Sequence, residues 1–89
     1  MASHTAVLVK LGDDDLLDYL MEQIPFNLAW DYGGGRDLYP TIKLDKHHFI
    51  VGIPVDRLTA TIAAEVLTRW GEDAGIWYEA MVFDKFYPF

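Results

Sequence analysis

The sequence predicts a single α+β domain, in which helices and strands alternate around one central buried strand. Three observations predict it. Residues 47–55 (HHFIVGIPV) carry a run that is apolar at successive positions, as in a strand buried on both faces. Residues 5–11 and 76–83 are rich in β-branched, apolar or aromatic residues, which is typical of strands. Two segments between these strands have apolar residues at helical spacing.

The first strand, residues 5–11 (TAVLVKL), ends at Gly12 and is followed by a predicted helix. Asp13 is placed to cap that helix, because a side-chain oxygen before the first turn accepts a hydrogen bond from a free backbone N–H. Four apolar residues then follow at positions i, i+3, i+4 and i+7: Leu17, Leu20, Met21 and Ile24. A proline disfavours helical geometry in the residue before it, so we expect Pro25 to end the helix at Ile24.

The middle of the chain predicts extended structure. Apolar and polar residues alternate over residues 26–32 (FNLAWDY), the period of a half-buried strand, so this segment is interpreted as an additional strand or an ordered loop. Residues 33–37 (GGGRD) form a flexible turn. Residues 41–53 are interpreted as a β-hairpin that turns at Asp45 and Lys46 and ends in the central strand.

A second helix is the clearest element of the pattern. It is expected to begin after Asp56, as a capping residue, and to end at Gly71 or one turn later at Gly75. One apolar ridge with Ala63 and Leu67 beside it should face the core: Leu58, Ile62, Val66 and Trp70. The last strand, residues 76–83 (IWYEAMVF), alternates between two faces of the sheet.

Assembled, these elements predict the order β, α, hairpin, α, β. The compact solution is a ferredoxin-like βαββαβ sandwich, because two right-handed crossovers place the first and central strands side by side in an antiparallel sheet. Both helices then cover one face of that sheet. Residues 26–32 would supply one extra strand.

Size and charge restrict the function. A chain of 89 residues forms one domain, residues 1–89, since independent cores need on the order of 50 to 200 residues. The net charge of −7 repels phosphate backbones and anionic membranes, so we expect neither direct nucleic-acid binding nor membrane binding. No apolar run resembles a signal peptide or a membrane span, which favours a cytoplasmic protein.

No motif indicates catalysis, a cofactor or a metal. The chain has no cysteine, and its one serine, Ser3, lies near the N-terminus, outside any nucleophile motif. His47 and His48 are adjacent, and adjacent strand residues point to opposite faces, so they cannot both bind one metal ion from a regular strand. The acidic run at residues 13–15 is better explained by helix capping than by Mg²⁺. These features favour a protein that is not an enzyme.

The face of the sheet opposite the helices is the predicted binding surface. If Lys10 and Glu79 mark that face, it also displays apolar side chains, and large exposed apolar patches commonly mark interfaces. The residues expected to bind a partner come from this face and from the extra strand: Leu8, Trp77, Glu79, Met81, Phe83, Trp30 and Tyr32. Alternatively, residues 26–32 or the aromatic tail, residues 84–89, fold over the face and bury it.

Two hypotheses follow. In the first, the chain is a small acidic interaction module, such as an inhibitor or accessory factor of the phage-encoded type, and its larger partner is a basic protein such as one that handles nucleic acid. In the second, it is a homodimer whose two sheets face each other and enclose an apolar small-molecule pocket. Cofactor-independent chemistry by His48 or Glu79 would belong to this second hypothesis.

Overall fold

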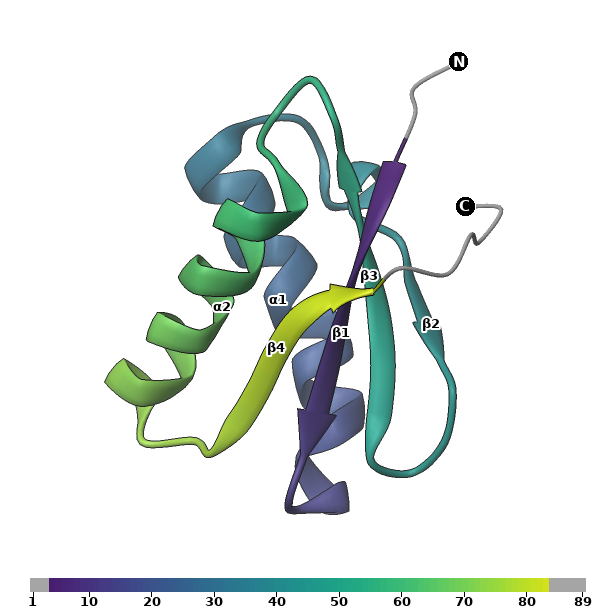
Figure 1. The fold of residues 1–89 in the computed structure, drawn as a ribbon, viewed down its shortest axis with the longest axis vertical. Coiled ribbons are helices and arrows are strands. Elements are labelled where there is room, and N and C mark those ends of the chain that lie inside the picture. Colours follow the sequence, from purple (N-terminus) through teal and green to yellow (C-terminus); the bar gives the residue numbers. More distant parts are fainter. Residues whose placement is uncertain (1–3, 84–89) are drawn as a thin grey trace.

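The computed structural model describes residues 4–83, and over this range strands and helices follow the predicted order (Figure 1). Two short 3₁₀ turns, Asp14–Leu16 and Arg36–Leu38, precede the first helix and the second strand. The main elements are β1 (His4–Leu11), α1 (Leu17–Tyr32), β2 (Thr41–Lys43), β3 (His48–Pro54), α2 (Ala60–Ala74) and β4 (Tyr78–Phe83).

The four strands form one antiparallel sheet in the order β2-β3-β1-β4. This order places β1 and β3 in the middle, as expected for the ferredoxin-like arrangement, and the predicted α+β class is confirmed. Both helices lie on the same side of the sheet (Figure 1). The hairpin of β2 and β3 turns at residues 44–47, as the sequence indicates.

The core lies between the sheet and the helices, because alternate residues of each strand point toward the helices. Val7, Val9 and Leu11 of β1 are fully buried there. The central strand is buried on both faces, as predicted. Phe49, Val51 and Ile53 face the helices, and Ile50 points to the opposite face.

The predicted strand at residues 26–32 is wrong, because this segment is the second half of α1. Pro25 lies inside the helix and does not end it. The reason is burial: Leu28, Ala29 and Tyr32 continue the helical stripe at positions i+3, i+4 and i+7 from Pro25 and contact the core. Gly33, at φ 89°, ends the helix, and its N–H donates to Ala29.

Helix α2 begins later than predicted. Thr59, and not Asp56, caps it by accepting a hydrogen bond from the N–H of Ile62, at 3.2 Å. The predicted ridge is wrong in part, because Ile62 is exposed and the stripe that faces the sheet is made of small residues and one leucine: Ala60, Ala63, Ala64, Leu67 and Gly71. The helix ends at Gly75, whose left-handed conformation (φ 70°) suits glycine.

Two further expectations concern what surrounds the domain. Within residues 4–83, neither helix has the length and apolar character needed to cross a membrane. The tail at residues 84–89, which was one of two segments that could cover the sheet, lies outside the described residues. The other segment, residues 26–32, does not cover the helix-free side, since it belongs to α1.

Candidate functional site

The strand register defines the face of the sheet that no helix covers, here called the helix-free face. Cross-strand partners lie side by side on the same face, so the register arranges its side chains in rows across the sheet. One row is Glu79, Lys10 and His48, the next is Met81, Leu8, Ile50 and Ile42, and the third is Phe83, Ala6 and Gly52. The assignment of Lys10 and Glu79 to this side of the sheet is therefore confirmed.

The middle row is apolar across all four strands. Ile50, in the centre, lies between Leu8 and Ile42 and is fully buried although it faces away from the helices. Met81, at the edge of the sheet, is 40% exposed. The row therefore offers its accessible apolar surface at the β4 end.

Trp77 extends this face beyond the end of β4. The β1–β4 register, continued by one step, sets it opposite Gly12, and a Cβ on Gly12 would lie 3.1 Å from Cε3 of the indole. The ring therefore lies close to Gly12, which has no side chain, while 67% of Trp77 remains exposed. An exposed indole is the type of side chain that anchors protein interfaces.

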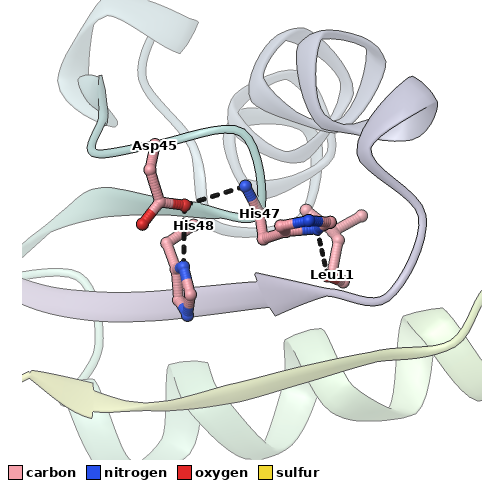
Figure 2. A network of polar contacts seen from close by, with 4 residues as sticks. All are labelled: Leu11, Asp45, His47 and His48. Carbon is pink, nitrogen blue, oxygen red and sulfur yellow. Dashed lines mark hydrogen bonds and ion pairs between the residues drawn. The ribbon is translucent and has the colours of Figure 1, made fainter.

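The hairpin turn holds a network of polar contacts beside the charged row (Figure 2). Oδ1 of Asp45 accepts hydrogen bonds from Nδ1 of His48 and from the backbone N–H of His47, both at 2.8 Å. These hydrogen bonds, the one from His48 first, lower the pKa of the Asp45 carboxyl. Asp45 thus shapes the turn that leads into the central strand.

The histidines do not form a common site. Nδ1 of His47 lies 3.2 Å from the carbonyl oxygen of Leu11, which can only accept, so this nitrogen carries the proton. The rings of His47 and His48 diverge from the turn (Figure 2). His4 lies at the opposite end of β1, where Nε2 is 2.9 Å from the carbonyl oxygen of Leu38.

The three carboxylates at residues 13–15 lie within 4.8 Å of one another and are exposed. The side chain of Asp13 accepts a hydrogen bond from the backbone N–H of Asp15, at 3.0 Å, as expected of a capping residue. The geometry of this cluster is therefore that of a helix start.

Two of the predicted binding residues lie elsewhere. Trp30 and Tyr32 belong to α1, on the other side of the sheet from Trp77, so the structure does not bring them into the helix-free face. Trp30 is 82% exposed, and Tyr32 contacts the core. Sequence reasoning missed that Trp30 shares one exposed helix stripe with Tyr19 and Phe26, at i, i+7 and i+11, because it assigned residues 26–32 to a strand.

Two buried tyrosines join the elements around the site. The hydroxyl of Tyr78 donates to the carbonyl of Leu67 in α2, and burial raises the pKa of Tyr78 to about 12. The hydroxyl of Tyr39 donates to the carbonyl of Gly33 at 3.0 Å, and burial raises the pKa of Tyr39 as well. The first of these contacts fixes the edge strand β4 against α2.

Comparison with known proteins finds no matching family model, no matching curated protein and no matching solved structure.

Proposed function

We propose that this chain is a small acidic protein-interaction module, of the inhibitor or accessory kind, which binds a larger protein through its helix-free face. The observation that carries the proposal is the exposed apolar surface of this face: Met81 ends an apolar row that crosses the whole sheet, and the indole of Trp77 lies on the other side of Glu79 along the same strand face. Aromatic residues and methionine are enriched at the centres of protein interfaces.

The charge of the chain supports a basic partner. A net charge of −7 attracts cationic protein surfaces and speeds their diffusional encounter. Surfaces of that kind occur on proteins that handle nucleic acid, since they neutralise phosphates with lysine and arginine. In this proposal the module competes for, or attaches to, such a surface.

Affinity capture tests the proposal with three immobilised baits: the wild type, Met81→Asp and Phe26→Asp. Phe26 is the matched control, because it is similarly exposed but lies on α1, away from the helix-free face. We expect a partner on the wild type and on Phe26→Asp, and at least a tenfold loss on Met81→Asp, since a charge buried in an interface costs several kcal/mol. Equal recovery on all three baits, or no specific partner at low and high salt, would contradict the proposal.

A homodimer through the same face is the second candidate, and one observation favours it. Lys10 and Glu79 are cross-strand partners, so a twofold axis through this face can bring each lysine near the glutamate of the other copy. The enclosed small-molecule pocket of this hypothesis would form only between the two copies, and a hollow of about 410 Å³ that Trp77 and Glu79 help to line lies nearest to it. Sedimentation decides between a monomer and a dimer.

A further inference from the structure

The two edges of the sheet differ in how they are protected. Edge strands expose unpaired backbone groups, and proteins usually shield them with short strands, lysine or proline. β2 has all three devices: it is three residues long, carries Lys43 and follows Pro40. β4 has none of them, since it runs for six residues, YEAMVF, without lysine or proline. Among residues 4–83, therefore, one edge of the sheet is shielded and the other, β4, is left open to another strand.

Hydrogen bonding shows which backbone groups face that open edge. The N–H of Leu11 donates to the carbonyl of His47 at 2.8 Å, so the odd-numbered residues of β1 point toward β3 and the even-numbered ones toward β4. Glu79, Met81 and Phe83 are the β4 partners of the even-numbered residues, and their backbone N–H and C=O groups point inward, toward β1. The backbone groups of the alternate residues point outward: Tyr78, Ala80 and Val82. Within residues 4–83, β4 pairs with β1 alone.

The space beside this edge is accessible on both faces. Met81 and Val82 are neighbours that point to opposite faces, and they are 40% and 42% exposed. On the helix side, a hollow of about 410 Å³ lies between β4 and α2. Small side chains form its walls, including Ala64 and Thr68 on the helix and Ala80 on the strand. An added strand would place alternate side chains in this hollow.

The charges of the hollow select the kind of strand. Glu65 and Glu72 line it from α2 and are opposed by one cation, Arg69. The hollow therefore favours lysine or arginine, whose apolar stems can cover Ala64 and Ala80 while the charged group reaches a carboxylate. A second copy of the chain fits less well, because it would bring two further glutamates to the same place, on a molecule that already carries −7.

We propose that an extended basic segment of the partner protein adds to β4 as a fifth strand. Backbone hydrogen bonds to Ala80 and Val82 supply affinity, and alternate basic side chains enter the hollow between β4 and α2, as in other cases of strand addition. The intervening side chains lie beside Met81, on the helix-free face. This inference rests on the proposed function and names the binding mode and chemistry of its partner.

In the first test, an eight-residue synthetic peptide of alternating lysine and threonine is added to the isotope-labelled full chain. Its binding is observed by NMR of the chain. With saturating peptide, we expect hydrogen exchange at the amides of Ala80 and Val82 to slow at least tenfold. The outward amides of the other edge, Thr41 and Lys43, should not change. A peptide in which glutamate replaces lysine should have no effect. Shifts confined to Trp77 and Met81 would overturn the proposal and place the peptide on the helix-free face.

Substitutions provide the second test. Val82→Pro removes an outward N–H and leaves the bonds to β1 in place, so it should weaken peptide binding at least tenfold, whereas Thr41→Pro on the opposite edge should not. If Val82→Pro fails to fold, the double variant Glu65→Lys with Glu72→Lys decides, because both residues are exposed on α2 and the fold does not depend on them. Unchanged binding of the peptide to this double variant would overturn the proposal.

Three outcomes separate this inference from the proposed function or from pairing between two copies. A captured partner that is lost on Met81→Asp but kept on Val82→Pro leaves the proposed function standing and overturns strand addition. A dimer in sedimentation, with Ala80 and Val82 already protected without peptide, overturns it in favour of pairing between two copies. Specific peptide binding without any captured partner supports the edge site and contradicts the proposed function.

Discussion

The ring of Tyr78 on β4 lies so close to Gly71 of α2 that no side chain fits between them. A Cβ on Gly71 would stand 2.7 Å from Cε2 and 2.9 Å from Cζ of the ring, closer than real contacts allow. One turn earlier in the helix, the carbonyl of Leu67 accepts the hydrogen bond of the same tyrosine. Two contacts thus set the distance between α2 and β4, and with it the width of the hollow beside β4.

Replacement of Gly71 by alanine should therefore destabilise the protein, although alanine is the better helix former. Overpacking costs about 1–3 kcal/mol and the gain in helix propensity is about 1 kcal/mol, so we expect a net loss of up to about 2 kcal/mol in a urea titration. Gly35→Ala is the matched control, since nothing lies within 4 Å of its Cβ and its φ is −89°. An unchanged urea midpoint for Gly71→Ala would show that the ring of Tyr78 can move away at little cost.

Tyr78 should also make the domain sensitive to alkali. The folded state holds the proton of Tyr78 up to a pKa of about 12, and the unfolded chain releases it near the ordinary tyrosine pKa of 10.0. Because the pKa of Tyr78 is raised by folding, its contribution to the stability of the folded state is complete below pH 10. This contribution is lost as the pH rises toward 12. Stability measured against pH should fall less steeply over this interval in Tyr78→Phe than in the wild type.

The neutral-pH cost of Tyr78→Phe should be about 1 kcal/mol, for the lost hydrogen bond to Leu67. Tyr39 has a raised pKa as well, so both proteins should lose some stability at high pH, and the difference between them isolates Tyr78. Parallel curves between pH 10 and 12 would contradict the assignment.

The fold was predictable because its strongest signals agree. The buried run in β3, the alternation in β1 and β4 and the helical spacing in α2 each fit one layer of the same sandwich. The prediction for residues 26–32 was wrong because their apolar residues fit a period of two and a helical stripe equally well. Pro25, as an expected helix end, favoured the interpretation as a strand. Only the packing of Leu28 against the core, a long-range contact, distinguishes the two.

The candidate site was predictable in part, for a related reason. Alternation along a strand places Leu8, Glu79, Met81 and Phe83 on one face without knowledge of the partners. The support of Trp77 by Gly12 depends on strand register, which local sequence does not set. The hollow beside β4 depends on Ala64 and Thr68 of α2 meeting Ala80 of β4, which are well separated in the sequence, and no local pattern reveals this contact.

The two faces of β4 predict opposite effects for one kind of substitution. Ala80 points toward the helices, is half-buried against the core and shares a hollow with Glu65 and Glu72, so Ala80→Asp should cost about 1–2 kcal/mol by partly desolvating a carboxylate. Met81 points to the helix-free face, so Met81→Asp should change the free energy of unfolding by less than about 1 kcal/mol. Thermal or urea unfolding measures both. If Met81→Asp proved the more damaging of the two, the assignment of the faces would be inverted.

Pro25 gives the last prediction, because it lies where a helix normally excludes proline. It lacks the N–H that would bond to the carbonyl of Met21, and proline inside a helix is about 3 kcal/mol less favourable than alanine. Burial of the proline ring offsets part of this cost, since replacement by alanine removes about two carbon groups from the core, at roughly 0.8 kcal/mol each. Pro25→Ala should therefore raise the free energy of unfolding by about 1–2 kcal/mol, seen as a higher urea midpoint with an unchanged slope. A lower midpoint would mean that the contacts of the ring with the core, and not helix propensity, keep the second half of α1 in place.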